Sequence, residues 1–418
     1  MKRQDKSSEL TPLDIVQQIV SERISQVSGS EAVSLSDISA MVGRISAETI
    51  RAPQNLPITD NVAVDGYAIR LSALEANPKE WFPVKATVRA GHPFAGHIAA
   101  GEAAAVYTGA VLPEGVDCVF MHEDCLLKDG QVQIQISGRA GLNIRPAGEN
   151  LRQGEICIAD GDIVTPQDIG QLAAAGIAQL KVRSKLKIAL LSTGDEVASA
   201  FQTAAGNAQI LDANGPMLQG LLAADGFEAA SAQIIPDNRE ALSNAFSKAL
   251  DKADVLITSG GASDGLEDHT QAAMHDNGVE SLFWRIAMKP GRPMAVGQKA
   301  GKLVICLPGN PVAVYVCYKL LVAGWLKQML GMPAKPLLRA ELPVGFQHKK
   351  RADRAEFLRA RVETSDNGQA QLQINGRKGA GVISSLQGAD GLVEIPIGIT
   401  EVQVGDRLPF LPFRERGL

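Results

Sequence analysis

The sequence predicts a multidomain α/β protein with a central doubly wound parallel sheet, a β-rich lobe, a helical linker domain and a C-terminal β-barrel-like domain. Three observations support this fold class. The chain has 418 residues, too many for one compact core, and about 150 residues per domain suggests roughly three units. Between residues 185 and 331, short apolar strands alternate with helical segments, as in parallel sheets. The flanking segments contain short β-type runs broken by Gly and Pro.

The N-terminal segment predicts an amphipathic helix. Residues 11–26 offer Thr11 as the N-cap and Pro12 at the first helical position, followed by apolar side chains on one face. A second helix is expected after Thr165, because a proline follows at the first turn and Asp168 is the third residue along. These two segments form the expected helical domain.

From about residue 46 to 145 the pattern changes to short runs with frequent Gly and Pro, which indicates an inserted β lobe. After residue 335, alternating runs predict a small all-β domain. The expected domains are 1–45 with 146–184 (helical), 46–145 (β-rich lobe), 185–334 (α/β) and 335–418 (C-terminal β).

The central domain has the clearest alternation. Strands are predicted at 187–191, 230–235, 254–258 and 303–307. A helix is expected after Asn214. Another is expected to open at Asp237, with Glu240 at the spacing of a capping box. A long apolar helix follows the last strand. Right-handed crossovers between such strands build a doubly wound sheet.

Unusual residues gather at the predicted strand ends, where open parallel sheets bind ligands. Glycines there let backbone N–H groups approach a phosphate, and carboxylates beside them can hold Mg²⁺ or orient a water. Each turn alone also fits an ordinary loop, and Asp237 also fits a simple helix cap. The four strand ends are Thr193-Gly194-Asp195-Glu196, Pro236-Asp237, Ser259 to Gly265 (including Gly260, Gly261 and Ser263), and Pro308-Gly309-Asn310-Pro311.

Two cations, Lys289 and Arg292, lie three residues apart in a segment that also holds two prolines. Both could aim at one oxyanion, and a stiff loop loses less entropy on binding than a flexible one. Solvated surface charges are the alternative interpretation. The pattern favours an anion site.

Composition excludes several classes. A net charge of −5 disfavours nucleic-acid binding. The apolar stretch 303–325 is interrupted by prolines and a lysine, which disfavours a membrane span. The five cysteines show no CxxC spacing and the N-terminus no signal-peptide core, so a reducing, cytoplasmic compartment is expected. Neither GxxxxGK[ST] nor a strand-following GxGxxG occurs, which disfavours P-loop enzymes and dinucleotide oxidoreductases.

The motifs together resemble one family. The segment DNVAVDGYA at 60–68 resembles the DNSAMDGYA signature of the MoeA family of molybdopterin molybdenumtransferases, whose eukaryotic relative is the E domain of gephyrin. The other matching segments follow in the family's order: YTGA (107–110), LPEG (112–115), RPAGE (145–149), STGDE (192–196), SGG (259–261), KPGRP (289–293), LPGNP (307–311) and RAEFLR (354–359).

The resemblance implies an activity and an assembly. It implies a homodimer in which the β-rich lobe of one subunit closes the site of the other, and a central domain that binds molybdopterin. The reaction takes adenylylated molybdopterin and molybdate, cleaves the phosphoanhydride with Mg²⁺, and releases AMP and molybdenum cofactor. Encounters with the molybdopterin adenylyltransferase and with recipient molybdoenzymes are also implied.

Roles carried over by position are implied in the same way. Asp65 and Thr108 would come from the partner subunit's lobe, and Asp237 and Asp268 would be associated with the metal. Lys289 would hold molybdate with further cations. The implied catalytic set is Asp65, Thr108, Arg145, Glu196, Asp237, Asp268, Arg285 and Lys289. The implied ligand-binding set is Thr193, Gly194, Asp195, Asn214, Gly260, Gly261, Ser263, Gly265, Arg292, Pro308, Gly309, Asn310, Pro311, Arg359 and Ser384.

Several positions depart from the family pattern. Ala313 replaces a serine, Asp264 adds an acid, Leu266 replaces an acid and His269 replaces an aromatic residue, and VAVDGYA (62–68) stands where the family has SAMDGYA. Two alternatives therefore stay open: a non-catalytic molybdopterin-binding paralogue or carrier, and a nucleotide pyrophosphatase built on the same central domain.

Overall fold

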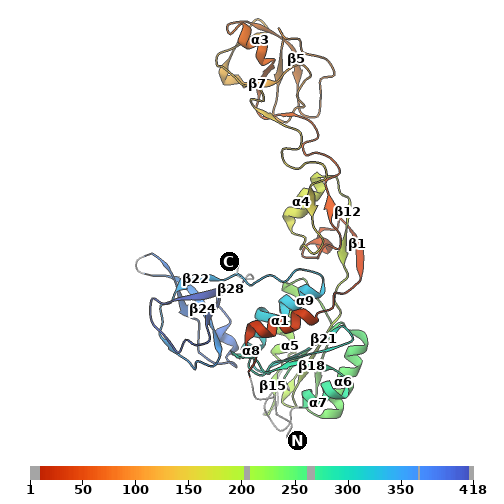
Figure 1. Cartoon of the computed structure of the whole chain (residues 1–418), viewed down its shortest axis with the longest axis vertical. Helices are drawn as coiled ribbons and strands as arrows, with labels where there is room; N and C mark the ends of the chain where they lie inside the picture. The colour runs from red at the N-terminus through yellow and green to blue at the C-terminus, as the bar shows by residue number, and fades with distance from the viewer. Residues whose placement is uncertain (1–9, 202–207, 261–268, 366–367, 414–418) are drawn as a thin grey trace. The chain divides into compact units, whose positions relative to one another are not determined.

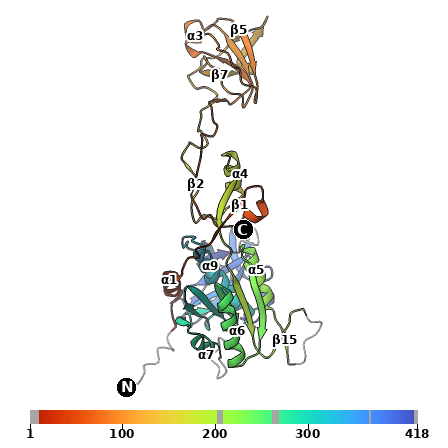
Figure 2. The same ribbon diagram turned by 90° about the vertical axis from the view of Figure 1, so that its right-hand side faces the viewer.

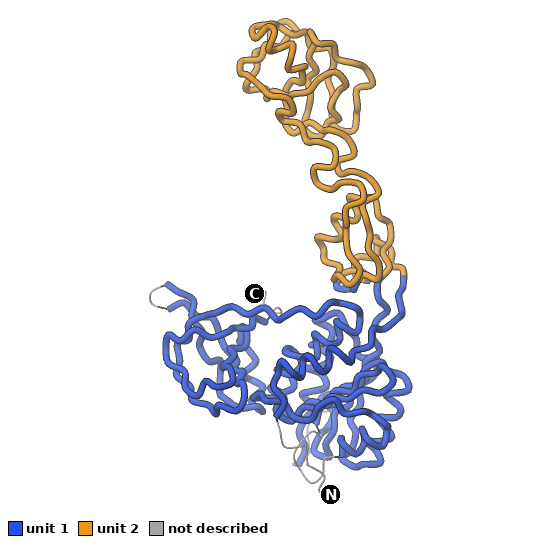
Figure 3. Tube along the Cα trace, in the orientation of Figure 1, with its two compact units in different colours: residues 1–31, 43–45, 182–418 blue, residues 32–42, 46–181 orange. Residues whose placement is uncertain are grey.

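The computed structural model describes residues 10–201, 208–260, 269–365 and 368–413. The chain divides into two compact units, which Figure 3 colours separately. Unit 1 comprises residues 1–31, 43–45 and 182–418, and unit 2 comprises residues 32–42 and 46–181. Within the described ranges, no helix combines the length and apolar character needed to cross a bilayer.

The core of unit 1 is a six-stranded sheet (Figure 1). Four neighbouring strands are parallel, as the sequence predicts, because β13 pairs with β16 and β17, and β17 pairs with β21. The order is β16-β13-β17-β21-β20-β18, with bounds β13 Ile188–Thr193, β16 Ala229–Ile235, β17 Val255–Ser259, β18 Glu280–Trp284, β20 Ala295–Lys299 and β21 Lys302–Leu307.

The other two strands, β18 and β20, were not predicted from the sequence. Strand β20 runs antiparallel to β21, and β18 antiparallel to β20. The turn between β20 and β21 consists of Ala300 and Gly301, both with positive φ (49° and 80°). Two such residues form the tight turn that matches the twist of a two-stranded hairpin. A hairpin therefore extends the sheet at this edge.

Helices cover both faces of the sheet, which confirms the doubly wound class. One apolar cluster joins α6 and α7 to β13, β17 and β21, and α6 and α7 lie next to each other in Figures 1 and 2. Helices α5 and α8 contact β13 and β21 without entering that cluster. The helices are α1 Leu13–Arg23, α5 Asn214–Ala224, α6 Arg239–Lys252, α7 His269–Asp276, α8 Pro311–Cys317 and α9 Ala323–Met329, with a π-helical segment η3 Tyr318–Val322 between the last two.

Two predicted helix starts are each wrong by one residue. Helix α1 has Pro12 as its N-cap, because the backbone of Thr11 is instead bonded to Arg285 and Ala287. Helix α6 has Asn238 as its N-cap, and the Asn238 side chain accepts from Ala241 N at 2.8 Å. The capping box expected at Asp237 therefore does not form there.

Residues 340–412 form an antiparallel sheet around an apolar core, as predicted for the C-terminal domain. A two-residue strand from the central segment, β19 (Met288–Lys289), adds to its edge, with Lys289 opposite Glu356. The order is β19-β24-β26-β28-β22, with bounds β22 Ala340–Pro343, β24 Ala355–Thr364, β26 Gly391–Ile395 and β28 Arg407–Pro412; β25 Ala370–Ile374 pairs with β24, and β23 His348–Lys349 with β27 Glu401–Val402.

Unit 2 contains the predicted β-rich lobe, a six-stranded sheet in the order β7-β4-β6-β5-β9-β8. Its centre requires glycine at position 66, because a Cβ there would lie 1.8 Å from the carbonyl oxygen of Phe120. The helix predicted after Thr165 is present as α4, Pro166–Ala174, and Thr165 and Asp168 form a capping box at its start. The lobe strands are β4 Gly66–Ile69, β5 Phe82–Val88, β6 Ala103–Val106, β7 Cys118–Met121, β8 Cys125–Lys128 and β9 Gln131–Ile134.

Candidate functional site

The carboxyl ends of β13, β17 and β21 meet closely. A Cβ on Gly260, whose φ is +99°, would lie 2.6 Å from both oxygens of Thr193. Gly260 N donates to Leu307 O at 3.2 Å, and Gly309 lies against Gly260. Only glycine fits at position 260, so backbone atoms rather than side chains form this edge of the sheet.

A polar network joins this edge to α5. The Asp212 carboxylate accepts from Ser192 Oγ at 2.7 Å and from the amides of Asn214 and Gly215 at 2.9 and 3.0 Å. Asn214 Nδ2 donates to Gly309 O at 2.8 Å. Asp212 was not predicted as a site residue, although an Asp two residues before a helix start is a known turn signal.

Two buried oxygens at the edge have no hydrogen-bond partner among the described residues: Thr193 Oγ1 and Asn214 Oδ1. Buried polar atoms in native proteins are normally satisfied, so such atoms suggest a ligand or water. Both residues belong to the predicted ligand-binding set. Gly261, Ser263, Gly265 and Asp268, which the prediction also includes, lie outside the described residues.

Acidic side chains flank the same edge. The Asp195 carboxylate accepts from Asp237 N at 2.9 Å, which joins the ends of β13 and β16. A Cβ on Gly194 would meet the Glu196 carboxylate at 2.7 Å, so Glu196 folds back over that turn. Mg²⁺ prefers carboxylate oxygens and is often held by only one or two, together with substrate phosphates. The donor set fits such an ion, although the described residues contain no group of three metal-ligating side chains.

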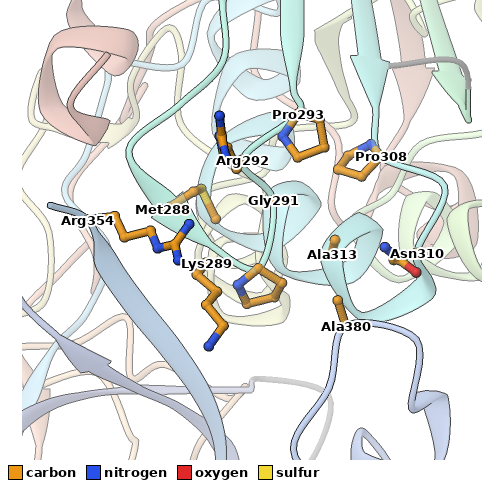
Figure 4. A pocket seen from close by; sticks show the side chains of 11 residues that line it. Met288, Lys289, Gly291, Arg292, Pro293, Pro308, Asn310, Ala313, Arg354 and Ala380 are labelled. Atoms are coloured by element: carbon orange, nitrogen blue, oxygen red, sulfur yellow. The ribbon is translucent and has the colours of Figure 1, made fainter. Parts of the chain in front are cut away.

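A pocket of about 120 Å³ lies beside the loop 289–293. Three cationic residues, Lys289, Arg292 and Arg354, are among those that line it, and in Figure 4 the charged ends of Lys289 and Arg292 point in opposite directions. Arg354 was missing from the predicted set, although it belongs to a matching motif. The remaining lining residues are Met288, Pro290, Gly291, Pro293, Pro308, Asn310, Ala313 and Ala380.

The loop reaches this position because it packs tightly. A Cβ on Gly291, whose φ is +113°, would lie 2.6 Å from Cys317 Sγ. Opposite the loop, Val312 N donates to Ala380 O at 3.0 Å, so the start of α8 and the C-terminal domain close one wall. Ala313, the position where the family has a serine, lies on that wall.

Lys289 is paired with a buried acid that was not predicted as a site residue. Its Nζ lies 2.8 Å from Glu356 Oε1, and the two side chains are 54% and 6% exposed. The second oxygen, Oε2, lies 3.3 Å from His348 Nε2. Burial disfavours the charged form of Glu356, but Lys289 and His348 outweigh it and hold the pKa of the carboxyl below its usual value.

Arg359 and Ser384 do not line the pocket. Arg359 is buried, with Nε donating to Ser385 Oγ at 2.9 Å and Nη2 to Arg377 O at 3.1 Å. Burial lowers the pKa of the Arg359 guanidinium. Ser384 is exposed and is the neighbour of the serine that Arg359 binds. In this structure Arg359 fixes the loop that carries Ala380.

The lobe of unit 2 holds a separate pair. Asp65 Oδ1 accepts from Thr108 N at 2.7 Å and from Thr108 Oγ1 at 2.8 Å. The backbone bond, followed by the hydroxyl bond, lowers the pKa of Asp65. Arg145 forms an ion pair with Glu149 at 2.8 Å in the same unit. Thus the structure brings Asp65 and Thr108 together within the lobe.

Arg285 adopts a positive φ of 75° next to the loop that carries Lys289, with its amide bonded to Met294 O at 2.9 Å. Lys289 and Asn310 share the pocket, and Pro311 begins the helix behind it. Most described members of the predicted central site therefore lie either at the sheet edge or around this pocket.

Comparisons with known proteins agree along the chain. It matches the MoeA N-terminal region (domain I and II) at residues 11–176, a probable molybdopterin binding domain at 189–328 and the MoeA C-terminal region (domain IV) at 341–413. The molybdopterin molybdenumtransferase of Haemophilus influenzae is 33% identical over 88% of this chain and 91% of its own length. Molybdopterin molybdenumtransferase 2 of Mycobacterium tuberculosis is 30% identical over the same shares, 88% and 91%.

Solved structures give the same result. A molybdopterin biosynthesis MoeA protein from Pyrococcus horikoshii OT3 has a TM-score of 0.82 at 26% identity and is matched over 97% of this chain and 100% of that chain. A fold match of this extent accompanies the sequence match to the bacterial relatives. The chain belongs to the MoeA family.

Proposed function

We propose that this protein inserts molybdate into adenylylated molybdopterin and releases AMP together with molybdenum cofactor. The observation that carries the proposal is the pocket lined by Lys289, Arg292 and Arg354 in the same unit as the glycine-built sheet edge. Relatives named molybdopterin molybdenumtransferase support the assignment. Both reactants are anions, so their binding together needs a local surplus of cations in a chain whose net charge is −5.

The pocket is proposed to hold molybdate. Three fixed cations around a small cavity suit a compact oxyanion, and two of them are arginines with planar, multiple donors. Asn310 adds an uncharged amide at the rim. The residues would act by binding and orienting the oxyanion, because preorganised charges need no rearrangement during reaction.

The sheet edge is proposed to hold the adenylylated pterin. Backbone groups at Gly260 and Gly309 lie close enough together to contact a phosphate without side-chain obstruction. Thr193 Oγ1 and Asn214 Oδ1 would take the hydrogen bonds that they lack among the described residues. This arrangement would orient the phosphoanhydride toward the acids at the ends of β13 and β16.

Those acids are proposed to hold Mg²⁺ and to orient water. Asp237 and Asp268 would be the metal-associated pair, and Glu196 would accept a hydrogen bond from the attacking water. When bound, Mg²⁺ screens the phosphate charge and makes the phosphorus easier to attack. Asp195 would position Asp237, because its carboxylate already holds the Asp237 amide.

The lobe pair completes the proposal. In a homodimer, each subunit's Asp65 and Thr108 would act in the site of the other subunit. Thr108 would orient the Asp65 carboxylate through two hydrogen bonds, which also lower the pKa of that carboxyl. Arg145 would assist from the same lobe, and Arg285 would support the cation-bearing loop.

A reconstitution assay tests the function. The purified protein is incubated with adenylylated molybdopterin, Mg²⁺ and molybdate, and both AMP and active cofactor are measured; the cofactor is detected by activation of a cofactor-free molybdoenzyme. We expect the two products in equal amounts. AMP without active cofactor would instead favour a pyrophosphatase, and tight pterin binding with neither product would favour a carrier.

A paired variant sharpens this assay. Arg292→Ala should suppress molybdate-dependent product formation, because one of the pocket's cations is lost. Arg407→Ala removes a cation from the exposed end of β28, far along the chain, and should leave both products unchanged. Equal activity of the two variants would remove the pocket from the mechanism.

A further inference from the structure

Glu356 is the one acidic residue that is buried among the described residues, and it lies next to a pocket of cations. Burying a carboxylate is costly unless it is paired, so its presence calls for a structural or functional reason. Its position follows from the fold, because β19 and β24 pair in parallel with Lys289 opposite Glu356. The sheet therefore presents this acid directly to the pocket's lysine.

The carboxylate is fixed from its far side. Lys378 Nζ lies 2.8 Å from His348 Nδ1, and His348 Nε2 lies 3.3 Å from Glu356 Oε2. An ammonium group can only donate, so Nδ1 accepts and the ring proton lies on Nε2, the nitrogen closer to Glu356, although the 3.3 Å contact lacks hydrogen-bond geometry. The order Lys378, His348, Glu356 and Lys289 thus runs from the C-terminal domain to the pocket. Only Oε1 is left for the lysine, at 2.8 Å.

Lys289 needs such a partner. Its side chain is 54% exposed, and a free lysine samples many rotamers. In Figure 4 the ammonium end of Lys289 and the guanidinium end of Arg292 point away from each other, although both residues line the pocket. One of the three ammonium donors is used by Glu356, and two remain for a ligand.

We infer that Glu356 is a positioning residue: through its ion pair it holds Lys289 at the pocket wall and so sets the affinity for a tetrahedral oxyanion. This inference rests on the proposed function, because it assigns the pocket to molybdate. Glu356 does not touch the anion. It restricts the rotamers of the Lys289 side chain. The conformational entropy of that side chain is therefore lost during folding rather than during binding.

Calorimetric titration of the full-length protein with sodium molybdate alone tests the inference. Glu356→Gln should raise the dissociation constant about tenfold, the effect of ordering one long side chain on binding. Lys289→Ala should weaken binding at least as much. The double variant should bind no more weakly than Lys289→Ala, because Glu356 acts only through Lys289. Additive losses would overturn the inference, as would unchanged or tighter binding by Glu356→Gln.

Two further variants separate position from charge and from folding. Glu394→Gln breaks the Arg339 ion pair (3.0 Å) on the neighbouring strand and should bind molybdate like the wild type. Glu356→Asp keeps the charge but withdraws it from Lys289, so it should also bind more weakly than the wild type. If Glu356→Asp binds molybdate as tightly as the wild type, the negative charge at this position is sufficient for the affinity, and the positioning role is overturned. That variant also serves if Glu356→Gln does not fold.

The titration also separates this inference from the proposed function. Non-additive loss of binding in a protein that never forms cofactor would support the positioning role and contradict the proposed reaction. Normal cofactor synthesis with unchanged binding by Glu356→Gln would do the reverse. If the wild type binds no molybdate at all, the positioning role is overturned together with the pocket assignment.

Discussion

The sheet edge and the cation pocket are built in different ways. At the edge, the close approach of backbone atoms determines the structure, and the decisive residue, Gly260, has no room for a side chain. In the pocket, charged side chains decide, and Lys289 depends on an acid from a different part of the chain. The edge should therefore fail when atoms are added, whereas the pocket should fail when charge partners are removed.

The largest effect is expected from Gly260→Ala. The new Cβ would lie 2.6 Å from Thr193 O at a φ of +99°, so the backbone must shift. Strain and overpacking together should lower the free energy of unfolding by about 3 kcal/mol or more. Urea unfolding followed by circular dichroism measures this change.

The matched control is Gly220→Ala in α5, where a Cβ meets nothing within 4 Å. Alanine is favoured over glycine in a helix by about 1 kcal/mol, so this variant should gain stability. Equal losses of unfolding free energy in the two variants would mean that the close backbone approach at Gly260 does not determine the stability of this sheet edge.

A smaller effect is expected from Asp212→Ala. The carboxylate holds two amides at the start of α5 and the buried hydroxyl of Ser192. Losing it should cost about 1 to 2 kcal/mol, the range for a lost cap plus an unsatisfied hydroxyl. Asp212→Asn keeps one acceptor oxygen and should lose less, as measured by the same unfolding experiment. A larger loss in Asp212→Asn would contradict this account.

Gly260 and Glu356 show what could and could not be predicted from the sequence. Gly260 was predicted because glycine at a strand end has a direct backbone meaning, and the parallel strands followed from local apolar runs. Glu356 was not predicted as a site residue, because its role depends on β19 pairing with β24 across 67 residues of chain, which local patterns do not record. The antiparallel strands β18 and β20 were also not predicted.

The helix starts were predictable only to within a residue or two. Asn238 and Asp237 both have side chains suited to capping, and tertiary contacts decide between them. The amide of Asp237 is already bonded to Asp195, so Asn238 takes the cap. At Thr165 the predicted cap is confirmed, because the Thr165 side chain accepts from the Asp168 amide as the N-cap of α4.

The pocket can be strengthened as well as broken. Ala313 is buried on its wall, and Ala313→Ser should add one hydroxyl donor for an oxyanion. A single hydrogen bond contributes about 1 kcal/mol, so molybdate should bind roughly fivefold more tightly. Ala313→Val adds volume without a donor and should weaken binding in the same titration. A serine variant that binds like the wild type would exclude this wall from the oxyanion site.

The smallest effect is expected on the pKa of Asp65, where the contributions of a backbone donor and a side-chain donor can be compared. Asp65 accepts from both the amide and the hydroxyl of Thr108, and the amide contributes more to lowering its pKa. A depressed carboxyl pKa stabilises the lobe at neutral pH, and this contribution is lost only as the pH falls through the folded-state pKa.

Thr108→Val removes the hydroxyl alone, so the pKa of Asp65 should rise only part of the way to its usual value. Thr108→Ser should leave it unchanged. A ¹³C NMR titration of the Asp65 carboxyl between pH 2 and 6, a window set by the usual carboxyl pKa of about 4, measures both shifts. Full recovery of the usual pKa in Thr108→Val would mean that the side chain, rather than the backbone, is responsible for the lowered pKa of Asp65.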